Sequence, residues 1–145
     1  MGKTLFTTSA TGVGGRTGTV SSNDTDLSFK LSRPKSFHGE GGTGTNPEEL
    51  FALGYAGCFG SAFQSVARKA KSDAKAAITV AVSMNEDDAL GGYQLSIAIT
   101  AEVADASLEE AQKLVDLAHE MCPYSKATRG NVDVTLHVKM KYRIP

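Results

Sequence analysis

One uncharged stretch constrains the fold of this chain more than any other feature. Residues 50–67 contain no Asp, Glu, Lys or Arg, and they include three glycines. The segment Asn46-Pro-Glu-Glu49 precedes them with an N-cap residue, a proline suited to the first helical position and two acids suited to the positive end of the helix dipole. The pattern therefore predicts a helix over residues 46 to about 71.

The uncharged stretch is close to the shortest length that spans a membrane, about 18 residues. It contains Ser61, Gln64 and Ser65, and it lacks the basic and aromatic flanks of a membrane span. We therefore expect a buried helix of a soluble core and no membrane partner. Glycine in a helix costs about 1 kcal/mol relative to alanine. The small residues therefore indicate that another backbone comes close, at positions Ala56, Gly57, Gly60 and Ser61.

Runs rich in Thr, Val, Leu and Phe before this helix, and alternating apolar residues after it, predict β-strands. The runs are 4–8, 16–22 and 26–32 before the helix, and 78–84, 95–103 and 132–140 after it. Ser107-Leu-Glu-Glu110 is a capping box that opens a second helix, and Pro123 ends it. The order of these elements predicts a single α+β domain over residues 1–145, with two main helices against largely antiparallel sheets.

Charge balance and cysteine count narrow the possible functions. With 15 basic and 16 acidic residues, the chain has no global field to hold nucleic acid. The N-terminal residues lack the apolar core of a signal peptide, so we expect a cytoplasmic protein, in which two cysteines seldom form a permanent disulfide. No Cys/His cluster offers zinc ligands. Gly39-Glu-Gly-Gly-Thr-Gly44 matches GxGxxG only formally, because no buried apolar strand precedes it, so we expect no bound dinucleotide.

Cys58 and Cys122 are the candidate reactive residues. Cys58 lies in the middle of the predicted long helix among small residues, and Cys122 lies at the end of the second helix, where a side chain can face a pocket. The alternative is that both are inert core residues, and their spacing leaves the two interpretations open. A thiol inside an apolar helix has a raised pKa, so a reactive Cys58 needs a neighbouring cation.

Arg16 is the notable candidate for that cation, because it follows the flexible turn Gly12-Val-Gly-Gly15. Taken alone, it is equally an ordinary surface arginine. Glu48 precedes Cys58 by ten residues, which is about 15 Å of helical rise and close to a quarter turn off the same face. Glu48 therefore cannot touch the sulfur of its own chain, but it can orient an arginine that does. Its alternative role is that of a first-turn acid on the helix dipole.

Two blocks of the sequence resemble a known family. GGTGTNPEELFALGYAGCF over residues 41–59 and CPYSKATRGN over residues 122–131 look like the signature blocks of the organic hydroperoxide resistance (Ohr) proteins, a branch of the osmotically-inducible-protein-C (OsmC) superfamily. The resemblance spans the whole chain, and the second block favours the Ohr branch. Lys126 and Glu49 depart from the family pattern at positions that carry no chemistry.

The resemblance implies an OsmC-like fold, an intertwined homodimer and a metal-free cysteine peroxidase. It implies that Cys58 is the peroxidatic cysteine and Cys122 the resolving one, with Arg16 and Glu48 as the paired catalytic residues. The implied substrate is an organic hydroperoxide, alkyl or lipid. The resemblance also implies that no cofactor is bound and that the reductant is dihydrolipoamide or a lipoylated protein. Two alternatives are an OsmC-type peroxidase of broader range and a redox sensor that does not turn over.

The uncharged helix also presents more apolar surface than a small domain with two helices can cover by itself. Leaving it exposed would create an apolar patch larger than the few hundred Å² usual for monomers. A second copy of the chain would explain both the glycines and the missing charge. Two arrangements then remain open: Arg16 reaches Cys58 within one chain, or the Arg–Glu pair approaches Cys58 from the partner.

Overall fold

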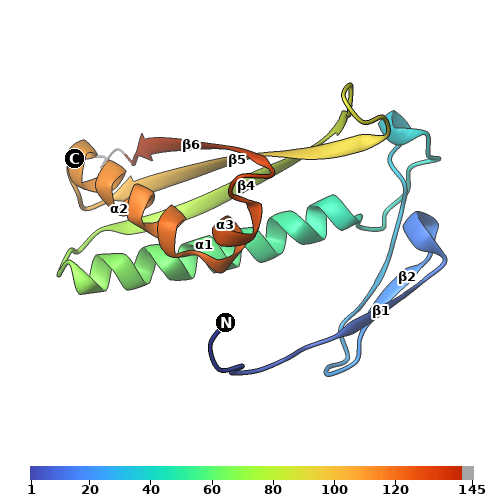
Figure 1. Cartoon of the computed structure of the whole chain (residues 1–145), viewed down its shortest axis with the longest axis horizontal. Coiled ribbons are helices and arrows are strands. Elements are labelled where there is room, and N and C mark those ends of the chain that lie inside the picture. Colours follow the sequence, from blue (N-terminus) through green and yellow to red (C-terminus); the bar gives the residue numbers. More distant parts are fainter. Residues whose placement is uncertain (142–145) are drawn as a thin grey trace. The chain divides into compact units, whose positions relative to one another are not determined.

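A computed structural model describes residues 1–141 of the chain, and the elements follow the predicted order (Figure 1). The chain separates into two compact units, Met1–Leu50 and the remainder from Phe51 onward. The boundary falls within the long helix α1, Pro47–Lys69. Each unit is described by itself below. Whether the two units form the expected single domain over residues 1–145 depends on how they associate, so the single domain stays a prediction.

The first unit contains a three-stranded antiparallel sheet in the order β1-β2-β3. Its strands are β1 (Ala10–Val13), β2 (Thr19–Ser22) and β3 (Ser28–Lys30). Two 3₁₀ turns accompany them, η1 (Gly15–Thr17) and η2 (Lys35–Phe37). The turn η1 connects β1 to β2, and η2 lies in the loop between β3 and α1.

The strand boundaries in this unit correct the sequence-based prediction. Residues 4–8 form no strand, because they pair with no partner strand within residues 1–141. Arg16 lies in η1 rather than in a strand, since Gly14 and Gly15 adopt positive φ angles of 85° and 60° that break the extended conformation. The predicted run 26–32 is shortened to β3.

The second unit contains a sheet in the order β4-β5-β6. Its strands are β4 (Lys75–Glu86), β5 (Tyr93–Ala104) and β6 (Asp133–Met140). β4 pairs antiparallel with β5, whereas β5 pairs parallel with β6. The helices α2 (Leu108–Met121) and α3 (Pro123–Thr128) form the crossover that this parallel pair requires. The α+β class with largely antiparallel sheets is thereby confirmed, and β5–β6 is the parallel exception.

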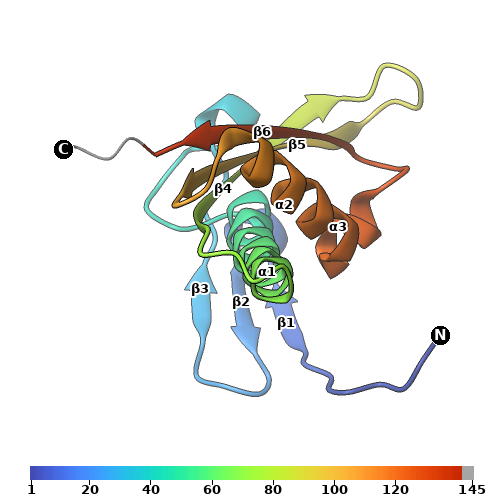
Figure 2. The same cartoon turned by 90° about the vertical axis from the view of Figure 1, so that its left-hand side faces the viewer.

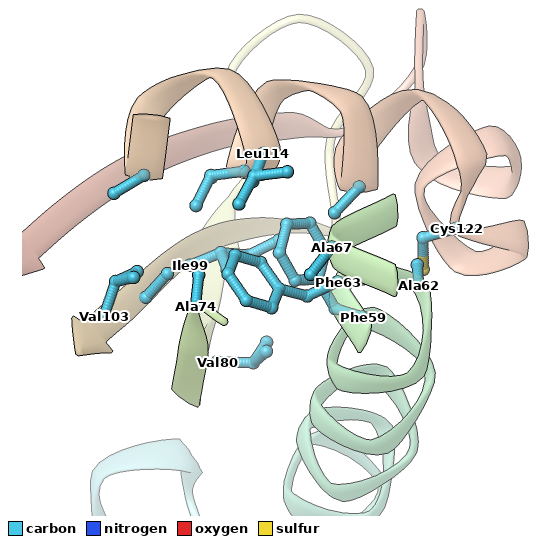
Figure 3. Packing of buried hydrophobic residues seen from close by; sticks show 14 of the residues in the cluster. Phe59, Ala62, Phe63, Ala67, Ala74, Val80, Ile99, Val103, Leu114 and Cys122 are labelled. Atoms are coloured by element: carbon cyan, nitrogen blue, oxygen red, sulfur yellow. The ribbon is translucent and has the colours of Figure 1, made fainter. Parts of the chain in front are cut away.

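The core of the second unit lies between the sheet and the helices α1 and α2, which cover one face of it (Figure 2). The largest fully buried side chains include Phe59 and Phe63 of α1, Ile99 and Val103 of β5, and Val115 of α2. Figure 3 shows the two phenylalanines pointing from α1 towards the strands and α2. The buried side chain of Cys122 belongs to the same cluster. The candidate reactive residues therefore lie at the edge of a packed core.

Within the second unit, the sheet and α2 pack against one face of α1. Leu53 is 63% exposed, and Gly57 and Ser61 are also exposed. The expectation of a helix buried on most sides is therefore not met within this unit, because the sheet and α2 cover the face that carries the phenylalanines. By length and composition α1 is also apolar enough to cross a membrane, which is weak support for a span since core helices of soluble proteins meet the same criterion.

Candidate active site

The two cysteines lie side by side although 64 positions separate them in the chain. The Cys122 thiol donates to the sulfur of Cys58, with the Sγ atoms 3.3 Å apart, and both thiols are free. Cys58 is partly exposed on α1, whereas Cys122 is fully buried. A disulfide has an S–S length of about 2.05 Å, so a shift of little more than 1 Å would join them.

Cys122 occupies a tight junction between two helices. Its backbone N–H donates to the carbonyl of Ala118 and ends α2, while Pro123 begins α3 at the position where a missing N–H is harmless. The Lys126 N–H in turn donates to the carbonyl of Cys122. The sequence-based prediction of a helix end at Pro123 is confirmed, and the same proline also starts the next helix.

The surroundings of Cys58 disfavour its thiolate. Burial raises the pKa of the Cys58 thiol, the backbone N–H of Tyr124 acts in the opposite direction, and the neighbouring Cys122 raises the pKa further. Within residues 51–141 no cation contributes to this balance. A nucleophilic Cys58 therefore needs a positive charge from elsewhere.

Arg16 and Glu48 form a bidentate ion pair within the first unit. Arg16 Nη1 donates to Glu48 Oε2 over 2.8 Å, and Nη2 donates to Oε1 over 2.7 Å. The hydrogen bond and the charge of Arg16 hold the pKa of Glu48 below its ordinary value. The hydrogen bond to Glu48 in turn raises the pKa of Arg16. The structure thus brings these two predicted residues together, as it brings the two cysteines together in the second unit.

The ring of Phe37 also holds the guanidinium of Arg16. The Arg16 Cζ lies 5.1 Å from the ring centroid, and the Cζ of Arg33 lies 4.8 Å from the same centroid. Arg33 Nε donates to the Phe37 carbonyl over 2.7 Å, which fixes this residue in the η2 turn. Both contacts have cation–π geometry. From the sequence Phe37 was expected as a core aromatic residue, and no regular spacing indicated that Phe37 or Arg33 would lie beside Arg16.

A chain of hydrogen bonds joins the three helices of the second unit. The hydroxyls of Tyr55 and Ser125 lie 2.7 Å apart, and Ser125 Oγ lies 2.8 Å from His119 Nδ1. The Thr128 hydroxyl lies 3.3 Å from that of Tyr55. Burial lowers the pKa of His119, and the charge of Arg129 lowers it further. A neutral imidazole can accept a hydrogen bond from the Ser125 hydroxyl, and the Ser125 hydroxyl can then accept one from Tyr55.

Gly54 is the α1 glycine at which the chain itself leaves no room for a side chain. A Cβ there would lie 2.6 Å from Tyr124 Oη, whereas at Gly57 no atom lies within 4 Å. At Gly60 the nearest atom, Ile78 Cγ1, lies at an ordinary 3.8 Å. The expected close approach at Gly57 and Gly60 is therefore absent within the described part of the second unit. The Tyr124 ring also packs against Phe51 and Tyr55 (centroid distances 6.0 and 5.5 Å).

Two further features of the second unit bear on ligand binding. No group of three or more His, Cys, Asp or Glu side chains in the described part of the chain could hold a metal ion. A groove of about 470 Å³ is lined by Val66 and Lys69 at the end of α1 and by Lys113, Leu117 and Met121 of α2. Neither cysteine lines this groove.

Comparisons with known proteins agree on one family. Residues 39–137 match the family model described as OsmC-like protein. The chain is 47% identical over 135 residues to the organic hydroperoxide resistance protein OhrB of Bacillus subtilis (strain 168), covering 93% of this chain and 98% of the relative. It is 45% identical over 134 residues to the organic hydroperoxide resistance protein of Xanthomonas axonopodis pv. citri (strain 306), covering 92% and 94%. The crystal structure of Bacillus subtilis OhrB matches with a TM-score of 0.87 and 46% identity, over 94% of this chain and 100% of that one.

Proposed function

Because the chain belongs to the OsmC-like protein family and, within it, to the organic hydroperoxide resistance proteins, we propose that it is a thiol peroxidase that reduces organic hydroperoxides to alcohols. The observation that carries the proposal is the contact of two free thiols, Cys58 and Cys122, at 3.3 Å. One of them is partly exposed and the other is fully buried. This difference supports two roles, in which the partly exposed thiol of Cys58 reacts with the substrate and the buried thiol of Cys122 reacts only with Cys58.

The first step is oxygen transfer to Cys58. Its thiolate attacks the terminal oxygen of the hydroperoxide, an S–O bond forms and the O–O bond breaks. The alkoxide leaves and takes up a proton to become the alcohol. Cys58 is left as a sulfenic acid.

The second step joins the two cysteines. The Cys122 sulfur attacks the sulfenic sulfur, an S–S bond forms and the oxygen leaves as water. Because the Cys122 thiol already contacts the Cys58 sulfur, this step needs little movement. A dithiol of the dihydrolipoyl class, free or on a lipoylated protein, then reduces the disulfide by thiol–disulfide exchange and is itself oxidised to its cyclic disulfide.

Arg16 and Glu48 supply the activation that Cys58 lacks. We assign Arg16 as the cation that stabilises the Cys58 thiolate and donates to the peroxide oxygens. A guanidinium carries five N–H donors, and two of those of Arg16 point at Glu48. Glu48 thereby fixes the plane of the guanidinium and leaves the other donors for sulfur and substrate. Tyr124 follows Cys122 by two residues and its ring packs against Phe51, and these apolar side chains favour alkyl or lipid hydroperoxides over hydrogen peroxide.

A homodimer is part of the proposal. The exposed face of α1 carries Leu53 and Gly57 and no charged side chain between residues 50 and 67. A second copy that packs on this face would bury it. We expect the dimer to be cytoplasmic, with neither nucleic acid nor a membrane as partner.

A steady-state assay tests the function. Purified protein is mixed with cumene hydroperoxide and dihydrolipoamide, and hydroperoxide loss is followed for wild type and Cys58→Ser. The proposal predicts many turnovers for wild type and none for Cys58→Ser. A single stoichiometric burst would instead identify a redox sensor, and equal rates with hydrogen peroxide would identify an OsmC-type peroxidase of broader range.

A further inference from the structure

The hydrogen bond between Tyr55 and Ser125 repeats the spacing of the cysteine contact. Tyr55 precedes Cys58 by three residues, and Ser125 follows Cys122 by three. Side chains three apart on a helix lie on one face. The hydroxyl contact at 2.7 Å and the sulfur contact at 3.3 Å therefore join the same two segments of chain, about one helical turn apart.

These hydroxyls are the buried polar anchor of α3. The side chains of Tyr55 and Ser125 are fully buried, and that of Thr128 is nearly so. His119 of α2 contacts the Ser125 hydroxyl from a second helix at 2.8 Å. Leaving one partner of a buried hydrogen bond unpaired destabilises the fold. The network therefore resists any movement of α3, a helix of only six residues, relative to α1.

Cys122 depends on α3 for its place. It is the residue immediately before α3, and its thiol donates to the sulfur of Cys58. When Cys58 is a sulfenic acid, two reactions compete. Cys122 condenses with it and releases water, or a second hydroperoxide transfers another oxygen to give the sulfinic acid and another alcohol. The first reaction depends on the position of Cys122, and the second does not.

We infer that Tyr55 and Ser125 are positioning residues, which hold Cys122 against Cys58 so that disulfide formation outruns overoxidation. The inference rests on the proposed function. It assigns to the network a role in the second chemical step only, and none in the attack on the hydroperoxide.

The test compares Tyr55→Phe and Ser125→Ala with wild type. Each reduced protein reacts with graded cumene hydroperoxide, and mass spectrometry counts Cys58–Cys122 disulfide against Cys58 sulfinic acid. The first oxidation should keep its rate within about twofold, whereas disulfide formation should slow by about tenfold to a hundredfold, the size expected when reacting groups are misplaced by about 1 Å. The sulfinic fraction should rise accordingly.

Two further variants separate positioning from stability. Ser72→Ala removes the hydrogen bond from Ser72 to Glu110 in the same unit, and it should leave the ratio of products unchanged. The double variant Tyr55→Phe with Ser125→Ala should be no worse than the more impaired single variant, because the two act as one unit. Should Ser125→Ala fail to fold, Tyr55→Phe decides alone, since it keeps the ring and its packing.

The outcomes distinguish this inference from the function itself. If wild type forms the disulfide and Tyr55→Phe gives the same ratio of products, the hydroxyl network is merely structural and the inference is overturned. If wild type forms no Cys58–Cys122 disulfide at all, the proposed function fails and the inference fails with it.

Discussion

A Cβ atom placed on Gly54 would lie 2.6 Å from the hydroxyl oxygen of Tyr124. We therefore expect Gly54→Ala to destabilise the protein by about 1 kcal/mol, because overpacking outweighs the gain in helix propensity. In a Tyr124→Ala background the same change should stabilise by about 1 kcal/mol, since only the propensity gain remains. Urea unfolding of the four proteins measures both values. Equal effects in the two backgrounds would mean that the contact does not constrain Gly54.

Local signals in the sequence were sufficient for the framework of the fold. The N-cap of Asn46 is seen in its side-chain bond to the Glu49 N–H, and that of Ser107 in its bond to the Glu110 N–H. The alternation in 132–140 predicted β6, in which exposed and partly buried positions alternate along Asp133–Met140. These features depend on residues that are close together in the sequence, so they can be predicted from local sequence patterns.

Long-range contacts were beyond such arguments. Tyr55 and Ser125 are 70 positions apart, and no periodicity within either segment indicates that they meet. Their equal spacing from the two cysteines was the one available signal, and it becomes informative only once the sulfurs are known to touch. The prediction of a strand at 4–8 was wrong for the opposite reason. Its local pattern is typical of a strand, but these residues pair with no other strand in the described part of the chain.

The uncovered face of α1 leads to a prediction about assembly. Wild type should be a dimer by light scattering, and Gly57→Glu should be a monomer, because a charge would enter the apolar contact. Thr135→Glu on the exposed face of β6 is the control and should stay dimeric. A dimer that survives Gly57→Glu would place the interface on another surface.

Arg16 should control the reactivity of Cys58. In a Cys122→Ser background, Arg16→Ala should raise the pKa of the Cys58 thiol and slow the attack on hydroperoxide by about a hundredfold, as loss of an electrostatic donor does elsewhere. Glu48→Gln should act in the same direction but less. The pH dependence of Cys58 alkylation reports the pKa. An unchanged titration in Arg16→Ala would refute the proposed contact.

Subunit mixing asks whether Arg16 serves its own chain. Cys58→Ser is expected to be inactive, and Arg16→Ala is expected to retain about a hundredth of the wild-type rate. If Arg16 acts across the dimer, a mixed dimer contains one site with both defects and one intact site, and activity returns towards half. Mixed dimers confirmed by native mass spectrometry and lacking this recovery would assign Arg16 to the same chain as the cysteine.

The ion pair also predicts how stability depends on pH. Because Arg16 lowers the pKa of Glu48 in the folded state, the unfolded chain binds the proton more readily. The stabilisation is therefore complete above the ordinary glutamate pKa and is lost as the pH falls through the lower, folded value. Glu48→Gln should flatten the decline in the free energy of unfolding over this range, with Glu49→Gln as the neighbouring control. Identical acid profiles for wild type and Glu48→Gln would contradict the pairing.

The central claim, that Cys58 meets the hydroperoxide and Cys122 resolves the product, is tested most directly by a single-turnover trapping experiment. Cys58→Ser and Cys122→Ser each receive one equivalent of cumene hydroperoxide with a dimedone-type reagent present, and mass spectrometry locates the adduct. We predict that Cys122→Ser reduces one equivalent and carries the adduct on Cys58, whereas Cys58→Ser reduces none and carries no adduct. An adduct on Cys122 in Cys58→Ser, formed as fast as that on Cys58 in the other variant, would contradict the assignment.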